Sequence, residues 1–217
     1  MDEQNYSENG FKIDTETPEE APEENDSKQR PTAAQELFEW LDVLATAIIT
    51  VVIVFSLIFR VATIDGKSMN NTLFSNDKVV ITNFGYTPKY GDIVVISRNV
   101  ENSVDDVVTG QVPIIKRVIA VGGQTVNIDF ERGVVSVDGK ELHEEYTRTP
   151  TNLRYNDGVE FPVYVPEGYI FVLGDNRNDS LDSRSARIGE YGLIDTRYVL
   201  GHAVLRIFPF SSIGRLD

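Results

Sequence analysis

The sequence predicts a mostly β domain, a β-barrel or β-sandwich, preceded by one transmembrane helix and a disordered acidic tail. Three observations support this prediction. Of the 217 residues, 34 are Asp or Glu and 20 are Lys or Arg, and the excess acid is concentrated near the N-terminus. One long uncharged apolar run follows the acidic region. Short runs of β-branched and aromatic residues then alternate with turn residues up to the C-terminus.

The N-terminal region carries most of the negative charge. Residues 1–42 hold 13 acidic and 3 basic residues, a net of −10 out of −14 for the chain. Residues 1–32 contain Pro and few aliphatic side chains, so they cannot bury enough apolar surface to offset the entropy lost on ordering. We expect residues 1–32 to form a disordered tail. The rest of the chain is nearly neutral, which argues against a nucleic-acid binder with a basic stripe.

The apolar run Val43–Phe59 contains no charged residue, Pro or Gly. With Leu41 before it and Val61–Ile64 beyond, it approaches the ~20 residues that cross a ~30 Å hydrocarbon core. Trp40 lies where an interfacial aromatic side chain is expected. We therefore expect residues 33–60 to form a transmembrane anchor helix with its flank.

Two alternatives to an anchor are a buried helix of a soluble domain and a cleaved signal peptide. A signal peptide would have an acidic n-region of more than 40 residues here, and no A-x-A site follows the run. Charge does not settle the orientation, because Lys28 and Arg30 precede the run while Arg60 and Lys67 follow it.

Residues 61–217 are expected to form one β domain that is long enough for its own core. Turn signals such as VDGK and NDG separate the expected strands. The strand-like runs are DKVVITNF, GDIVVISR, VPIIKRVIAV, QTVNID, GVVSVDG, FPVYVP, GYIFVLGD and YVLGHAVLRIF.

Composition also limits the chemistry. The chain has no Cys, which excludes a disulfide scaffold, a Cys-rich zinc site and a Cys nucleophile. His143 and His202 are its two histidines, which argues against a multi-histidine metal site.

The first segment with chemical potential is GKSMNNTL, residues 66–73. Two interpretations of Ser68 are open. One is a nucleophile on a loop, and the other is the N-cap of a helix, which is the commoner role of an isolated Ser.

The second segment, IIKRVI, places a Lys inside an apolar β run. If Arg117 faces solvent, the alternation of a strand turns Lys116 toward the core. Burial lowers the pKa of a Lys, and a neutral Lys serves as a general base. The alternative is an exposed Lys116, or an edge-strand charge that prevents aggregation.

The third segment is GDNRNDSLDSR, residues 174–184. It lacks the Gly at position 6 and the Glu at position 12 of an EF-hand calcium loop. We interpret it as a hydrogen-bonded turn in which carboxylates and guanidinium groups brace a neighbouring site.

Taken together, GKSMNNTL, GDIVV, IIKRVIAVGG and GDNRNDSLDSR resemble, in order and approximate spacing, the sequence boxes of type I bacterial signal peptidases. The resemblance covers roughly residues 40–217. The compact stretch between IIKRV and GDNR is similar to the small, single-anchor signal peptidases of Gram-positive bacteria. The resemblance implies a signal-peptidase-like β fold and a membrane-bound serine endopeptidase with a Ser/Lys dyad. Such an enzyme removes N-terminal signal peptides from exported preproteins after small P1 and P3 residues.

The resemblance also implies roles for single residues. Ser68 matches the nucleophile and Lys116 the general base. Ser180 matches the Ser that hydrogen-bonds and orients that Lys. Asp182 and Arg184 match an ion pair that braces the site.

Four further residues match supporting positions of the family. Asp175 matches an acidic residue that interacts with Arg184. Met69 matches the residue that packs beside the nucleophile. Ile64 and Ile115 fall where the family lines its pockets for small substrate side chains.

The chain departs from the family pattern at two positions. Asn71 stands where Pro is common, which removes a fixed φ but no catalytic group. Gly66 stands where some members have a Ser that donates to the oxyanion. We therefore expect the Ser68 N–H to bind the oxyanion, with the Gly66 N–H or a water as the second donor. Arg117 is expected to be structural.

The resemblance implies no metal, nucleotide or other cofactor. The implied partners are signal peptides of exported preproteins and the lipid bilayer, with no nucleic acid, and the chain is expected to be a monomer. The implied location is the cell membrane, single-pass, with a cytoplasmic N-terminus and an extracellular catalytic domain. The substrate is expected to bind as an added strand beside Val61–Gly66 and Val112–Ile115.

Three other functions stay open at this point. A Ser/His/Asp triad would require His143 or His202, and neither has a Gly-x-Ser-x-Gly partner. Self-cleaving repressors use Ser and Lys on a related β core, but they carry a DNA-binding domain and lack the GDNR box. A catalytically inactive, membrane-anchored binding paralogue with the same fold is the alternative from a different functional class.

Overall fold

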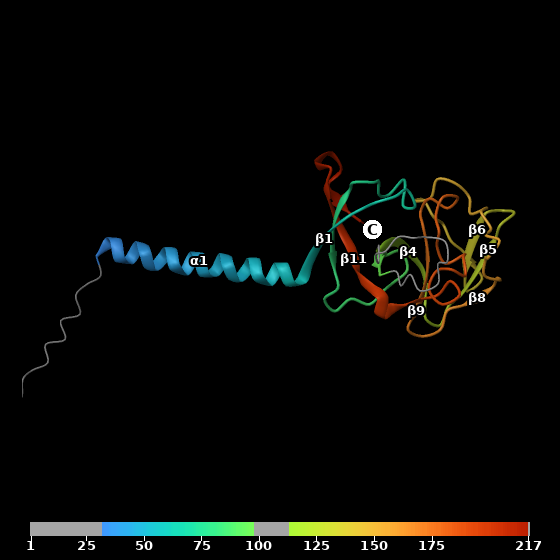
Figure 1. The fold of residues 1–217 in the computed structure, drawn as a ribbon, viewed down its shortest axis with the longest axis horizontal. Helices are drawn as coiled ribbons and strands as arrows, with labels where there is room; N and C mark the ends of the chain where they lie inside the picture. The colour runs from blue at the N-terminus through green and yellow to red at the C-terminus, as the bar shows by residue number, and fades with distance from the viewer. Residues whose placement is uncertain (1–31, 98–112, 217) are drawn as a thin grey trace, which may run out of the picture. The chain divides into compact units, whose positions relative to one another are not determined.

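The structure is a computed structural model that describes residues 32–97 and 113–216. Within these residues it contains one long α-helix and two antiparallel β-sheets (Figure 1). The prediction of a mostly β fold with one N-terminal apolar helix is confirmed. Apart from Thr32, the expected disordered tail lies outside the described residues.

Helix α1 spans Ala33–Ile58 and begins with reciprocal capping contacts. The Thr32 N–H donates to Gln35 Oε1 at 2.8 Å, and the Gln35 N–H donates to Thr32 Oγ1 at 3.4 Å. This is the capping-box pattern, which satisfies two N–H groups that lack partners inside the helix.

No residue of α1 is buried, and its most apolar 18-residue window has a mean hydropathy of 2.6. At 1.5 Å per residue the 26 residues extend about 39 Å, more than the hydrocarbon core of a bilayer. By length and composition, α1 is therefore able to cross a membrane.

The helix ends earlier than the apolar character of the sequence suggests. Strand β1, Phe59–Thr63, begins directly after Ile58 and pairs with β2. The inclusion of Val61–Ile64 in the membrane-spanning run is therefore wrong. The backbone groups of Val61 and its neighbours bond to β2 rather than along a helix.

The larger sheet has the strand order β1-β2-β11-β3-β4-β9-β10, and β12 pairs with β11. All of its pairings are antiparallel. After β1, its strands are β2 (Lys78–Thr82), β3 (Ile93–Ile96), β4 (Ile114–Val121), β9 (Tyr169–Leu173), β10 (Ile194–Asp195), β11 (Val199–Phe208) and β12 (Gly214–Arg215).

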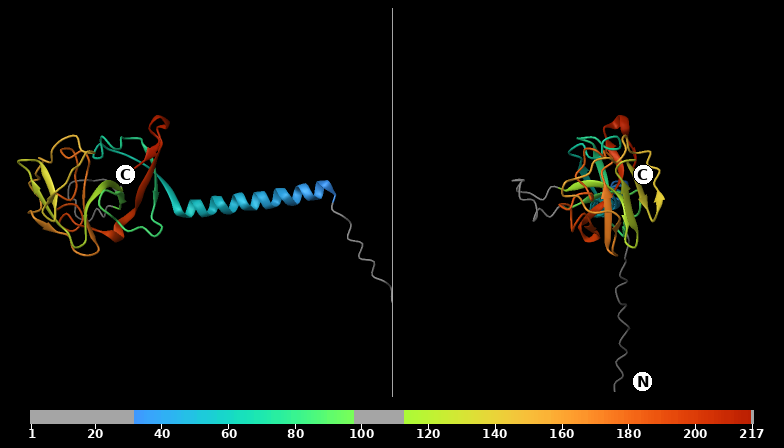
Figure 2. Two further views of the ribbon diagram at one scale, coloured as in Figure 1. Left: turned by 180° about the vertical axis from the view of Figure 1, so that it is seen from behind. Right: turned by 90° about the vertical axis from the view of Figure 1, so that its right-hand side faces the viewer.

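The smaller sheet has the order β7-β6-β5-β8 and lies at the end of the β domain opposite to β1 (Figure 2). Asp138 and Gly139, which join β6 to β7, both have positive φ, as a two-residue hairpin turn requires. The strands are β5 (Thr125–Asp129), β6 (Val134–Val137), β7 (Lys140–Glu141) and β8 (Val163–Tyr164). Two short 3₁₀ helices flank β11, η1 (Thr196–Tyr198) and η2 (Phe210–Ser212).

Each of the eight strand-like runs expected from the sequence contains a strand. Strand β4 is an interior strand of the larger sheet, because it pairs with β3 on one side and β9 on the other. It contributes to all three apolar clusters of the domain, with Ile115 in the first, Ile119 in the second and Val118 in the third. Side chains on both faces of β4 are therefore buried, so a charged side chain on either face of this strand is buried as well.

Candidate active site

Ser68 lies on the loop that joins β1 to β2. The base of this loop is closed by the Ile64 N–H, which donates to the Asp77 carbonyl at 2.8 Å. Met69 and Leu73 of this loop are buried in the first apolar cluster, the one that contains Ile115, and so fix the loop to the core. Ser68 itself is half-buried in a turn, and no helix begins there, so the N-cap interpretation is wrong.

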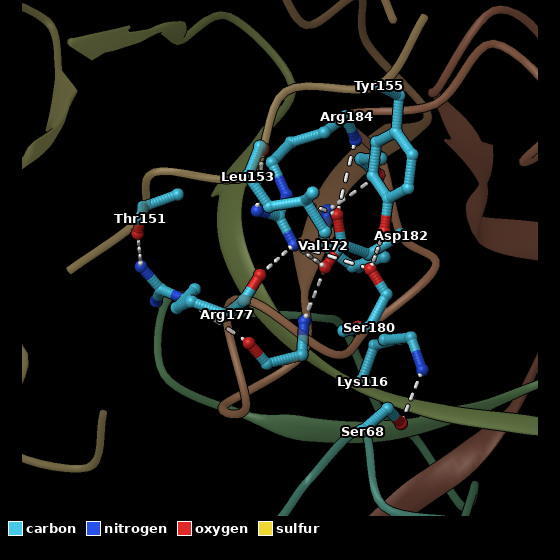
Figure 3. A network of polar contacts seen from close by, with 12 residues as sticks. Ser68, Lys116, Thr151, Leu153, Tyr155, Val172, Arg177, Ser180, Asp182 and Arg184 are labelled. Carbon is cyan, nitrogen blue, oxygen red and sulfur yellow. Dashed lines mark hydrogen bonds and ion pairs between the residues drawn. The ribbon is translucent and has the colours of Figure 1, made fainter. Parts of the chain in front are cut away.

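Lys116 reaches Ser68 from strand β4. Its Nζ lies 2.8 Å from Ser68 Oγ and 3.0 Å from the carbonyl oxygen of Ile115, and only 3% of the residue is exposed. Figure 3 shows the Lys116 amine directed at the Ser68 hydroxyl. The expectation of a core-facing Lys116 holds, and the alternative of an exposed or edge-strand Lys is wrong.

Asp182 and Arg184 form the ion pair that the resemblance implied. Arg184 donates through Nε to Asp182 Oδ1 at 2.8 Å and through Nη2 to Oδ2 at 2.9 Å, and both side chains are fully buried. Asp182 Oδ2 also accepts the Gly174 N–H at 3.0 Å. The pair therefore ties the far end of the 174–184 loop to the end of β9 (Figure 3).

Ser180 is buried beside this pair, but its contact differs from the prediction. Its Oγ has no hydrogen-bond partner among the residues that the structure describes. The expected hydrogen bond to Lys116 is therefore not formed, and Lys116 Nζ bonds instead to Ser68 and the Ile115 carbonyl. A buried hydroxyl without a partner is unfavourable, and the role of Ser180 in orienting Lys116 remains a prediction.

The Ser180 carbonyl, in contrast, is well bonded. It accepts the hydroxyl of Tyr155 and, at 3.3 Å, Nη2 of Arg184. Burial and then the charge of Asp182 raise the pKa of Tyr155 to about 12, so its hydroxyl remains a donor at neutral pH. Tyr155 was not predicted as a site residue, because it lies outside every recognisable motif.

Asp175 has a different partner from the predicted one. It accepts Nε and Nη2 of Arg117 at 2.9 and 2.8 Å, as well as the hydroxyl of Thr72. Arg117 pairs in register with Leu173, which brings it next to Asp175, while Asp182 occupies Arg184. The prediction that Asp175 binds Arg184 is wrong.

Arg117 also differs from the sequence argument, which assumed that it faces solvent. It is only 1% exposed, and its Nη1 donates to the Gly91 carbonyl at 2.7 Å. Alternation does put Lys116 and Arg117 on opposite faces of β4, but both faces are covered.

Gly66 has a φ of +100°, which suits Gly, and its N–H donates to Ser75 Oγ at 3.2 Å. The expected second oxyanion donor is thus engaged elsewhere in this structure. Asn71, where relatives commonly have Pro, has a φ of +96°, a value that Pro cannot adopt. The turn after the nucleophile therefore differs locally from one built on Pro.

The residues expected to line substrate pockets lie next to the nucleophile loop. Ile64 and Ile115 are 5% and 8% exposed and share an apolar cluster with Met69. Met69 directly follows Ser68 in the chain and is buried in this cluster, and its packing beside the nucleophile remains a prediction. The contribution of Ile64 and Ile115 to substrate pockets remains a prediction.

Neither histidine is bonded to Ser68. His143 is exposed beside Glu145, and His202 stacks on Tyr86 with ring centroids 5.0 Å apart. The Ser/His/Asp alternative has no support in this geometry. Within residues 32–97 and 113–216, no cluster of three His, Asp or Glu side chains is arranged to hold a metal ion.

Comparison with known proteins gives a consistent result. Residues 37–208 match the family model described as signal peptidase, peptidase S26. The chain is 35% identical over 189 residues to "Probable signal peptidase I-1" of Synechocystis sp., covering 86% of this chain and 90% of that protein. It is 33% identical to signal peptidase IB of Staphylococcus aureus, covering 82% and 92%. A signal peptidase I structure from Enterococcus faecalis matches with 28% identity over 54% of this chain and 97% of that chain, at a TM-score of 0.39.

Proposed function

Because this chain belongs to the type I signal peptidase family, peptidase S26, and is thus a serine peptidase, we propose that Ser68 and Lys116 form its catalytic dyad. The family assignment supports removal of signal peptides from exported preproteins as the reaction. The observation that carries the dyad is the 2.8 Å separation between Lys116 Nζ and Ser68 Oγ.

In the proposed acylation step, neutral Lys116 accepts the Ser68 hydroxyl proton. Burial supports this state, because it disfavours a charged ammonium. Ser68 Oγ then attacks the scissile carbonyl and forms a tetrahedral intermediate. Lys116 returns the proton to the departing amine, and the acyl-enzyme remains on Ser68.

In the proposed deacylation step, Lys116 removes a proton from a water that attacks the ester carbon. The proton passes to Ser68 Oγ as the new carboxylic acid leaves, and the acid then loses its remaining proton to solvent. The Ser68 N–H donates no hydrogen bond to any residue of the described chain, which supports its use as an oxyanion donor. A donor of this kind typically contributes about 3–4 kcal/mol to acyl transfer.

We propose that the peptide substrate adds as a strand near Ser68, beside β1 and the Ile114–Lys116 end of β4. Strand β1 is the last strand of its sheet, and the Ile114–Lys116 end of β4 pairs with β3 but extends past the end of β9. Main-chain hydrogen bonds would give affinity, and the pockets near Ile64 and Ile115 would select small P1 and P3 side chains. Val112, the outer limit of the expected binding segment, lies outside the described residues.

A preprotein cleavage assay tests the dyad. We expect Ser68→Ala and Lys116→Ala each to abolish processing of a preprotein with Ala at P1 and P3, because each removes one partner of the proton transfer. Ser136→Ala and Lys140→Ala are matched controls outside the site, and both should process normally. Normal processing by both dyad variants would overturn the Ser/Lys mechanism, whereas a wild-type protein that processes no preprotein would favour the inactive binding paralogue.

The pH–rate profile of the wild-type protein gives a second check. Because Lys116 must be neutral to act as the base, activity should rise with pH as Lys116 loses its proton. Half-maximal activity should occur well below the ordinary Lys value of ~10.4, because burial favours the neutral form. A required group that titrates near ~10.4 contradicts a buried, neutral base.

A further inference from the structure

Arg117 is held on its edges and on its face. Its two edges bind Asp175 and the Gly91 carbonyl. The ring of Tyr146 covers the planar face, with the guanidinium carbon 4.0 Å from the ring centroid. A desolvated guanidinium stacked on an aromatic ring is held more firmly than one fixed by hydrogen bonds alone. Because Arg117 follows Lys116 on β4, whatever fixes Arg117 also fixes the backbone that carries Lys116.

Arg177 is held by the same short segment of chain. Glu144 accepts Nη1 and Nη2 of Arg177 at 2.6 and 2.5 Å, and Glu144 Oε1 also accepts the Tyr146 hydroxyl at 2.7 Å. The Tyr146 ring lies 6.0 Å from the Arg177 guanidinium, so it is close to both arginines. Arg177 in turn donates through Nε to the Gly174 carbonyl at 3.2 Å.

The residues that the two arginines bind, Gly174 and Asp175, contact the loop that carries Ser68. Gly174 packs so closely on the nucleophile loop that a Cβ on it would lie 2.5 Å from the Ser68 carbonyl oxygen. The Asn176 N–H also donates to that oxygen at 2.9 Å. Asp175, which Arg117 binds, accepts the Thr72 hydroxyl four residues after Ser68. Arg117 therefore connects Glu144 and Tyr146 to the strand that carries Lys116, and Arg177 connects them to the loop that carries Ser68.

The charges in this arrangement are fixed. Burial works against the charged form of Arg177, but the hydrogen bonds and attraction of Glu144 outweigh it and raise its pKa. Burial, followed by the charge of Glu144 and the hydrogen bond to it, raises the pKa of Tyr146 above its usual range. Tyr146 thus remains a neutral donor, and Arg177 remains a cation.

We propose that Glu144 and Tyr146 are positioning residues of the peptidase, which hold Arg117 and Arg177 and thereby set the geometry of Ser68 and Lys116. The inference rests on the proposed function of that dyad. Both residues lie on the connection that follows β7, so the smaller sheet contributes to catalysis without contacting the reacting atoms.

The test measures kcat and KM for preprotein cleavage per folded molecule, with the folded fraction taken from urea unfolding of each full-length variant. Tyr146→Leu should lower kcat about tenfold or more and change KM less than about twofold, because small displacements of reacting groups are costly. Tyr146→Phe keeps the ring over Arg117 and should recover most of the kcat. Glu144→Gln keeps the size but weakens the hold on Arg177, and it should lower kcat as well.

Two exposed residues of the smaller sheet give matched controls. Tyr164→Leu and Glu141→Gln should both retain wild-type kcat, since Tyr164 is 58% exposed and the Glu141 side chain is 57% exposed. Wild-type kcat per folded molecule in Glu144→Gln, or in a folded Tyr146→Leu, would overturn the proposal. Should Tyr146→Leu not fold, Glu144→Gln decides the question by the same measurement.

A parallel Ser68→Ala assay separates this inference from the proposed function. Full activity in Ser68→Ala refutes the dyad itself. Loss of activity in Ser68→Ala together with unchanged kcat in Glu144→Gln refutes only the positioning role.

Discussion

At the scale of single residues, Gly174 lies where the 174–184 loop packs tightly against the nucleophile loop. A Cβ there would lie 2.1 Å from Ser180 Oγ and 2.5 Å from the Ser68 carbonyl oxygen. Both distances are shorter than any real Cβ contact, and the second involves backbone that cannot rotate away. Only Gly therefore fits at this position.

We predict that Gly174→Ala displaces Ser68 and lowers kcat for preprotein cleavage about tenfold or more. Overpacking of this kind should also lower the free energy of unfolding by about 1–3 kcal/mol. Gly214→Ala is the matched control, because a Cβ on Gly214 meets nothing within 4 Å. Equal activity in the two variants would show that the loops are not in contact as described.

The resemblance of four sequence boxes to a known family selected Ser68, Lys116 and the Asp182–Arg184 pair, whereas each local pattern alone left another interpretation open. The partner of Asp175 could not be selected in the same way. It depends on the register that sets Arg117 beside Leu173, and pairing across strands is not encoded in either segment alone. Glu144 and Tyr146 had no local signal, since their role arises from what the fold brings next to them.

At the scale of elements, strand β4 explains why a charged dipeptide occurs in an apolar run. Its two buried faces direct Lys116 to the nucleophile and Arg117 to Asp175, so one strand supplies both sides of the site. The strand itself was predictable from its β-branched residues. The burial of both faces was not, because it requires the loops and the smaller sheet to cover the second face.

The boundary between α1 and β1 was also beyond the sequence argument. Apart from Arg60, mainly apolar residues continue from Val43 to Ile64 with no periodicity that separates helix from strand. What ends the helix at Ile58 is the pairing of all five residues of β1 with β2, and this partner lies about twenty residues along the chain.

We predict that deletion of residues 1–58 leaves the β domain folded and moves the protein from the membrane fraction to the soluble fraction. No residue of α1 is buried, so the free energy of unfolding in urea should change little. Deletion of residues 1–64 is the contrasting variant, because it also removes β1 and the buried Ile64. It should be strongly destabilised, and equal stability of the two fragments would contradict the assignment of β1 to the sheet.

At the scale of the whole molecule, charge and hydropathy divide the chain into three parts. We propose a tail at residues 1–32, an anchor at 33–60 and a peptidase domain at 61–217. Strand β1 already begins at Phe59, so the first strand of the domain starts two residues before this boundary. The net charge of −10 over residues 1–42 then belongs mainly to the tail and its junction with the anchor. The remainder has a net charge of only −4, so the acidity of the chain carries no information about the substrate.

We propose that the tail faces the cytoplasm and the peptidase domain faces outward, where exported preproteins emerge. The absence of Cys makes this directly testable, because any introduced Cys is the only thiol in the protein. In intact spheroplasts, a membrane-impermeant maleimide should label Lys140→Cys, whose side chain is exposed at the β6–β7 hairpin. Ser7→Cys in the tail should react only after the membrane is permeabilised. Labelling of Ser7→Cys alone in intact spheroplasts would reverse the orientation, and labelling of both would show that the anchor does not separate two compartments.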